Sequence, residues 1–315
     1  MLIYPALKSG ASRFGVNRLT KFPFNFGMIM ENKTLMLRRL ILAFAATFCV
    51  FFMASGNAFA GDNDFKLSRL CGETGCGTPE AINDFKTLSR AYASLLAPMH
   101  FQPASTLGEE GFEIAVESKM SFSTEDNSSW KATNKNADAQ SEDGKYAAPD
   151  LFATIQLHMR KGLPFSFEVE GVFNWLANSE VFYVGAGLRW AITEGWWFLP
   201  DLSVRAHAGT VVGASEISLI NVNCDIALSY TWGLGGIASI TPYGGYSLLT
   251  NWSSSRPLLI PGADGAFESV FRRQQQFMHR GFVGLQLKGD FFVFGVEGEL
   301  GKQVMSVGLK IGADF

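Results

Sequence analysis

The sequence predicts an all-β fold, an antiparallel transmembrane β-barrel of about ten strands that follows a short N-terminal helical segment. Three observations predict it. Apolar and polar residues alternate with a period of two from Gly111 to the last residue. The alternating stretches span about 10–15 residues, longer than most globular strands but suited to tilted strands that cross a bilayer. An apolar segment near the N-terminus has the form of an export signal.

The composition indicates a folded, glycine-rich and aromatic-rich protein and excludes several classes. The chain has 315 residues, of which 47% are hydrophobic and only 17% charged, with 33 Gly and 28 Phe. This length fits one large barrel domain. The formal net charge of −3 provides no basic surface for nucleic acid. A single apolar stretch approaches the length of a membrane-spanning helix, so a bundle of membrane helices is excluded.

That apolar stretch resembles a secretory signal peptide. Leu40–Met53 follows a basic flank and ends shortly before Ala58-Phe59-Ala60, a small-x-small cleavage sequence. We therefore expect residues 1–60 to be an upstream extension plus signal peptide, cleaved after Ala60; a membrane anchor is the alternative. Cleavage removes seven basic residues and one acidic residue, which changes the formal net charge to about −9 and disfavours anionic partners.

The region after the cleavage site contains one predicted helix and a pair of cysteines. Thr78-Pro79-Glu80 is a helix start, and apolar residues follow at helical spacing through Ala81–Leu96. Cys71 and Cys76 are predicted to form a disulfide in an oxidising compartment. A metal site is disfavoured because no second Cys or His pair with ligand spacing follows. Cys224 stands alone and is interpreted as a small apolar side chain.

Ten stretches carry the strand alternation. In the first, Phe112 and Ile114 alternate with Glu113 and Ala115. The other stretches cover residues 151–159, 165–170, 182–190, 202–208, 220–230, 236–249, 276–288, 291–300 and 303–315. No helical period interrupts them, and the sheet must close because unpaired edges cannot be satisfied in hydrocarbon. Adding or removing one pair of strands, for about eight to twelve in all, fits the same pattern.

The connections between these strands alternate in length, which supports the barrel. The two longest polar connections, residues 123–148 and 251–274, lie on one side of the predicted barrel. Short connections, among them residues 160–164, 232–235 and 289–290, lie on the other side. Transmembrane barrels have this asymmetry of long external loops and short turns. Tryptophans lie near the predicted strand ends, as in aromatic girdles: Trp175 and Trp252 toward the long loops, and Trp190, Trp196, Trp197 and Trp232 toward the short turns.

The final strand allows a family to be suggested. Every second residue is apolar on counting back from the carboxyl end: Phe315, Ala313, Ile311, Leu309, Val307 and Met305. This pattern resembles the C-terminal signature of Gram-negative outer-membrane β-barrel proteins, which ends in an aromatic residue. Ala313 departs from it, because an aromatic residue is often found there. The resemblance implies location in the cell outer membrane and recognition of Met305–Phe315 by the barrel-assembly machinery.

The resemblance also implies a division of the chain and a set of partners. Residues 1–60 are the extension and signal peptide, residues 61–110 a periplasmic segment with one helix, and residues 111–315 the outer-membrane barrel. The expected partners are outer-membrane lipids, the assembly machinery and small solutes, with no nucleic acid. The sequence does not indicate an oligomeric state.

If the apolar row of each strand faces lipid, the opposite row faces the lumen. That row carries charges of both signs: Glu113, Glu117, Lys119, His158, Glu168, Glu170, Arg189, Arg205, His207, Asp225, Arg280, Glu297, Glu299 and Lys310. Because a ten-stranded barrel is narrow, we expect opposite charges in it to pair. The nearly balanced signs disfavour an ion-selective ring.

The sequence therefore predicts a non-catalytic barrel with an ion-paired lumen and a structural or small-solute channel role, without cofactor or metal. Glu168 and Glu170 share one strand face, as an acid–base pair would, but no G-x-S-x-G nucleophile motif accompanies His158 or His207. Two alternatives stay open. One is a surface adhesion or binding protein that acts through the two long loops, and the other is an outer-membrane lipid-modifying enzyme.

Overall fold

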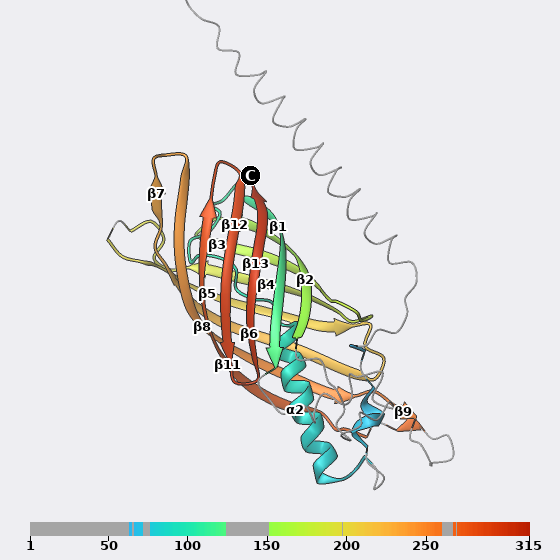
Figure 1. Ribbon diagram of the computed structural model, residues 1–315. Helices are drawn as coiled ribbons and strands as arrows, with labels where there is room; N and C mark the ends of the chain where they lie inside the picture. Colours follow the sequence, from blue (N-terminus) through green and yellow to red (C-terminus); the bar gives the residue numbers. More distant parts are fainter. Residues whose placement is uncertain are drawn as a thin grey trace, which may run out of the picture. The chain divides into compact units, whose positions relative to one another are not determined.

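The computed structural model describes residues 63–64, 66–71, 76–123, 151–196, 198–259, 267–268 and 270–315. Ten long antiparallel strands close into one barrel, which confirms the predicted fold class (Figure 1). They are β1 (Phe112–Ser123), β2 (Leu151–Leu163), β3 (Phe167–Leu176), β4 (Phe182–Ala191), β5 (Asp201–Val212), β6 (Ile217–Ser229), β8 (Ala238–Ser255), β11 (Gln274–Lys288), β12 (Phe292–Gly301) and β13 (Val304–Asp314). Each pairs with the next along the chain, and β13 pairs with β1 to close the sheet.

Three short strands lie outside this ring. β7 (Trp232–Leu234) pairs only with β8, and β9 (Leu258–Leu259) pairs with β10 (Phe267–Glu268). The expected long loop 251–274 is shorter than predicted, because its first five residues belong to β8, which ends at Ser255. The expected signal peptide and the greater part of the loop 123–148 lie outside the described residues.

The two ends of the barrel differ in their connections. We call the end that carries residues 164–166, 230–237, 289–291 and Phe315 the turn end. The opposite end, which carries residues 177–181, 213–216, 256–273 and 302–303, is the loop end.

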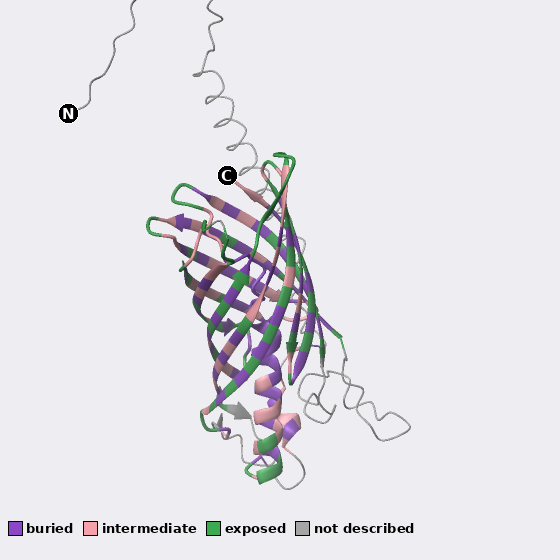
Figure 2. Ribbon diagram, turned by 90° about the vertical axis from the view of Figure 1, so that its left-hand side faces the viewer, coloured by how far each residue is buried: buried purple, intermediate pink, exposed green. Residues whose placement is uncertain are grey.

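The two faces of the barrel wall have opposite chemistry. On β13, Val307, Leu309 and Ile311 are exposed, whereas Gly308 and Lys310 between them are buried. Exposed and buried residues alternate in the same way along the other strands (Figure 2). The outer face is apolar because successive strand side chains point to opposite sides and the apolar row points outward.

The outward row provides a test of which face contacts lipid. Replacing Leu309, which is 56% exposed near the middle of β13, with Arg is expected to destabilise the inserted barrel by about 2–4 kcal/mol. Phe167→Arg is the matched control, since Phe167 is the first residue of β3, where the cost falls to about 0–1 kcal/mol. Denaturant unfolding in lipid vesicles measures both. Equal effects of the two substitutions would contradict the assignment of the lipid-facing row.

The N-terminal segment contains η1 (Leu67–Leu70) and α2 (Pro79–Leu96). The predicted helix start is confirmed, because Thr78 Oγ1 accepts a hydrogen bond of 3.2 Å from the Ala81 amide and Pro79 occupies the first turn. Among the described helices none is both long and apolar enough to cross a membrane.

The described part of residues 61–110, expected as a periplasmic segment with one helix, contains that helix within the barrel. α2 enters the barrel from the loop end with its C-terminal half buried (Figure 2). The chain then continues through the lumen and reaches β1 at the turn end, where the Gly162 amide donates to the Gly111 carbonyl. The physical reason lies in the C-terminal part of α2, since Ala91–Leu96 contains no charged residue and all six of its side chains are buried. We call residues 79–107 the plug segment.

Candidate functional site

The loop-end part of the lumen contains α2, which packs in an apolar core. The helix buries Phe85, Leu88, Tyr92, Leu95 and Leu96. Wall residues in the same core are Phe152, Leu176, Tyr183, Ile217, Leu219, Leu249, Met278 and Val304. Polar wall side chains also bind the helix: the Asn221 amide donates to the Ala93 carbonyl at 3.0 Å, and the Gln276 amide donates to the Ser89 hydroxyl at 3.0 Å.

The remaining lumen wall is charged. The structure places all the charged residues and histidines predicted for the lumen in the buried row that faces the barrel interior. Arg160, which also lies in this row, joins the first of two ion-paired networks. Its guanidinium is 3.2 Å from Glu113 and 2.7 Å from Glu168. Lys310 lies 2.6 Å from Glu113, and Arg189 lies 2.8 Å from Glu168.

A second network continues along the wall and is joined to the first where the Lys310 ammonium lies 4.0 Å from Glu117. Arg205 is 2.5 Å from Asp225 and 3.4 Å from Glu170. His158 contacts Glu117 at 2.9 Å through Nδ1 and Glu170 at 3.3 Å through Nε2. Wall charges of opposite sign are thus neighbours.

Two lumen charges differ from these. Arg280 pairs with Glu299 at 3.0 Å, whereas neither Lys119 nor Glu297 forms an ion pair within the described residues. Both bind the main chain of the plug segment instead.

Lys119 binds the C-terminus of α2. Its ammonium donates to the carbonyls of Ser94 at 3.1 Å and Ala97 at 2.9 Å. The Asn174 amide donates to the Leu96 carbonyl at 3.0 Å. The last carbonyls of a helix lack intrahelical partners and carry partial negative charge, so a cation and an amide donor stabilise this end.

Glu297 binds the first extended residues after the helix. Its carboxylate accepts hydrogen bonds from the amides of His100 at 2.8 Å and Phe101 at 2.5 Å. Tyr243 donates its hydroxyl to the same carboxylate at 2.9 Å. Lys310 donates to the Phe101 carbonyl at 3.0 Å. Glu297 therefore accepts from the N–H groups of His100 and Phe101, and Lys310 donates to the C=O group of Phe101.

The same arrangement continues toward the turn end. Arg189 donates to the carbonyls of Pro103 and Ser105, the latter at 3.1 Å. The hydroxyl of Ser229 accepts a hydrogen bond from the Ala104 amide at 2.9 Å. An extended segment cannot satisfy its own main-chain groups, so the wall must do so.

Two carboxylates complete this set. Glu194 accepts from the Thr106 amide at 2.8 Å, and Glu168 accepts from the Leu107 amide at 3.2 Å. The extended part of the plug segment is thus hydrogen-bonded to the wall from His100 to Leu107.

Two aromatic rings of the plug segment, those of His100 and Phe101, pack closely against the barrel wall. The His100 ring stacks on Phe282 with a centroid separation of 4.4 Å. The Phe101 ring lies against Gly308, where a Cβ atom would come within 2.3 Å of it. Glycine at position 308 therefore makes room for this ring.

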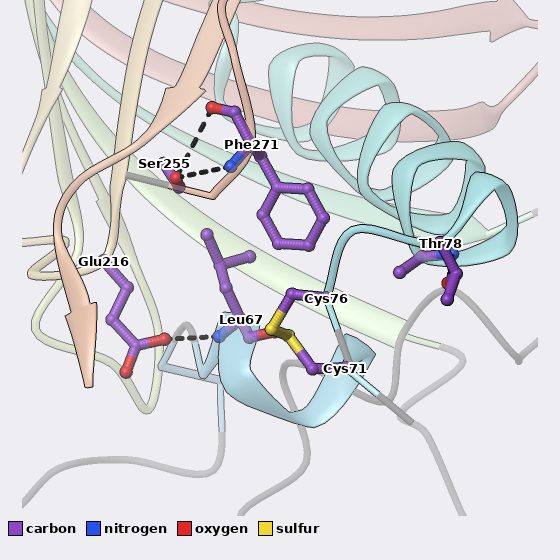
Figure 3. The surroundings of a disulfide bond; sticks show 8 residues. Leu67, Cys71, Cys76, Thr78, Glu216, Ser255 and Phe271 are labelled. Carbon is purple, nitrogen blue, oxygen red and sulfur yellow. Dashed lines mark hydrogen bonds between the residues drawn. A yellow bond between two sulfur atoms is a disulfide. The ribbon is translucent and has the colours of Figure 1, made fainter. Parts of the chain in front are cut away.

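The disulfide between Cys71 and Cys76 is present, as predicted, and lies at the loop end (Figure 3). Beside it, the Leu67 amide donates to the carboxylate of Glu216 in the β5–β6 connection. Burial raises the pKa of the Glu216 carboxyl, and the Leu67 hydrogen bond opposes this shift. These contacts join the N-terminal segment to the rim of the barrel.

A second contact with the rim of the barrel is made by α2. Phe85 of α2 stacks on Phe271 of the β8–β11 connection at 4.6 Å. The Phe271 amide in turn donates to the Ser255 hydroxyl at 2.9 Å (Figure 3). The N-terminal segment is thus joined to the rim by aromatic packing as well as by the Leu67–Glu216 hydrogen bond.

The sequence interpretation missed the plug segment as a functional element, although a signal was present. Between Ala91 and Gly108 no Asp, Glu, Lys or Arg occurs, in a chain with 17% charged residues. An uncharged stretch of this length is unusual for a solvated connection, and it indicates burial. In the described part of the chain, no group of three or more potential ligand side chains could hold a metal.

The barrel is apolar outside and charged inside, the reverse of a soluble barrel, and its antiparallel strands close without an edge. The fold is that of an outer-membrane β-barrel. No family model and no curated protein matches the chain.

Solved structures of outer-membrane barrels are similar to this chain at low identity. The N-terminal β-barrel domain of OprF from Pseudomonas aeruginosa is 14% identical and covers 66% of this chain and 99% of its own, with a TM-score of 0.28. An outer membrane channel from Pseudomonas putida F1 is 11% identical and covers 70% and 99%, with a TM-score of 0.33. Ail, the attachment invasion locus protein of Yersinia pestis, is 15% identical and covers 66% and 99%, with a TM-score of 0.25.

Proposed function

We propose that this outer-membrane barrel is a non-catalytic structural protein whose lumen is closed by its own plug segment, so that it is not a permanently open pore. It resides in the cell outer membrane with its loop end outside. The observation that carries the proposal is the occupied lumen: α2 fills the apolar part, and the wall hydrogen-bonds the main chain from His100 to Leu107.

The free energy gained by burying the side chains of α2 supports a closed lumen. Five large side chains of α2 are buried in the lumen, and full burial of each stabilises by roughly 1.5–3 kcal/mol. Together these contribute roughly 10 kcal/mol, a preference of about 10⁷-fold for the closed form. Spontaneous release of the helix is therefore rare.

The charges of the wall support the same proposal. A selective channel presents rings of one sign to its solute. Here arginines, carboxylates and His158 pair across neighbouring strands, so the two networks tie the strands together. Such pairing is expected of a lumen that is filled.

The histidines support the absence of catalysis. Both ring nitrogens of His158 contact carboxylates, of Glu117 and Glu170. His207 contacts the hydroxyl of Tyr183 at 3.4 Å and is buried in the wall. Neither histidine forms a hydrogen bond to a serine or cysteine nucleophile within the described residues.

Single-channel recording in planar bilayers tests the proposal. The refolded wild-type protein is expected to give no discrete conductance steps, because the plug segment occupies the lumen from end to end. Circular dichroism and heat-modifiable gel migration confirm that a silent preparation is folded. Reproducible steps from the folded wild type would contradict a closed barrel.

A further inference from the structure

The extended part of the plug segment is bound as a separate peptide ligand would be. Residues 97–107 contain no helix or strand. Their main-chain groups bond mainly to side chains of the wall: carbonyls to Lys119, Arg189 and Lys310, and amides to carboxylates and a serine hydroxyl. The wall therefore presents donors and acceptors in the order that an extended peptide requires.

Most of these contacts do not depend on the side chains of the segment. Its main-chain groups are bound by charged wall residues, while its own side chains carry no Asp, Glu, Lys or Arg. One exception is Gln102, which donates to Glu170 at 2.7 Å. A peptide of different sequence could form the same main-chain hydrogen bonds.

The two unpaired charges define what the site requires. Lys119 and Glu297 have plug-segment main-chain groups as their principal partners, with Tyr243 also bound to Glu297. Removing the segment without replacement would leave a buried cation and a buried carboxylate short of partners, which is costly. A ligand that supplies both N–H and C=O groups at peptide spacing meets this requirement.

We propose that the charged part of the lumen is a binding site for extended peptide main chain, and that a short peptide is the class of ligand that replaces residues 98–107 there. The stacking surface of Phe282 and the space at Gly308 favour a peptide with aromatic residues. This inference rests on the proposed function, because the site is occupied by the chain's own segment in the closed barrel.

Phe101→Pro frees the site without changing the wall. Phe101 has a φ of +48°, which proline cannot adopt, and proline also lacks the amide that donates to Glu297. The experiment titrates the full-length Phe101→Pro barrel, in detergent, with a fluorescein-labelled peptide of the sequence of residues 98–107, and follows fluorescence anisotropy. Circular dichroism confirms folding, and Phe101→Ala replaces the variant if it does not fold.

Two matched controls address the main-chain contacts. One is the same peptide with N-methyl groups on the two amides that correspond to His100 and Phe101. The other is Glu297→Gln in the Phe101→Pro background. Each removes charge-assisted hydrogen bonds and is expected to weaken binding about tenfold or more. Wild-type protein is expected to bind the labelled peptide at least about tenfold more weakly than Phe101→Pro, because its own segment competes.

The inference is supported if the labelled peptide binds Phe101→Pro saturably and if N-methylation of the peptide and Glu297→Gln each weaken that binding. Absence of saturable binding to the folded variant, or equal affinity for the methylated and unmethylated peptides, overturns it. The outcome is separate from that of the proposed function: conductance by the wild type contradicts the closed barrel, whereas a silent wild type with no peptide binding to the variant contradicts only the peptide site.

Discussion

Replacing Leu88 with Asp is expected to make transient release of α2 from the lumen about 10³- to 10⁴-fold more frequent, so that a silent barrel gives brief conductance steps. Leu88 is fully buried in the apolar core that α2 shares with Phe152 and Leu249. The substitution removes roughly 1.5–3 kcal/mol of apolar burial and adds a carboxylate whose desolvation costs several kcal/mol. A total of roughly 5 kcal/mol or more weakens closure by about three to four orders of magnitude.

Single-channel recording measures the opening, and limited proteolysis of the released helix provides a second readout. Asn83→Asp is the matched control, because it adds the same charge to an exposed position of the same helix. The control is expected to stay silent and resistant. A folded Leu88→Asp barrel that does not conduct would show that the helix is not the barrier in the lumen.

Replacing Arg160 with Met is expected to lower the free energy of unfolding by about 3–5 kcal/mol. Arg160 is buried and lies between two carboxylates, 3.2 Å from Glu113 and 2.7 Å from Glu168. Removing the Arg160 guanidinium leaves the buried carboxylates of Glu113 and Glu168 with one cationic partner fewer each. Lys310 and Arg189 remain beside them, but each of these also donates to the plug segment.

Equilibrium unfolding in denaturant, followed by tryptophan fluorescence in vesicles, measures this change. Lys161→Met is the matched control: it removes a neighbouring cation from the outward row, where Lys161 donates to the Glu109 carbonyl at 3.2 Å. Its effect is expected to be below about 1 kcal/mol. Similar losses for both variants would mean that the buried network does not stabilise the barrel.

The strands and their faces were predictable because the signal is local. Side chains of a strand alternate between two faces, so the sequence of β13 alone places Leu309 outside and Lys310 inside. The helix start at Thr78 and the pairing of Cys71 with Cys76 are also local, since both depend on residues a few positions apart. The lumen-facing row followed from the same alternation once lipid was assigned to the apolar row.

The path of residues 79–107 was not predictable in this way. The uncharged end of α2 and the uncharged extended stretch after it both indicate burial. Neither pattern identifies the surface that buries them. The answer depends on Lys119 and Glu297, which form no ion pair within the described residues and instead bind the main chain of the plug segment, and this appears only once the register of the ten strands is known.

The sequence by itself determined the facing of the strands, the helix and the disulfide, because each is encoded by periodicity or spacing along the chain, whereas it left the number of strands between eight and twelve. Only the tertiary structure decided which charges pair and what fills the lumen. Those contacts join residues far apart in sequence, such as Phe101 and Lys310, and form only when the closed sheet brings its walls around the plug segment.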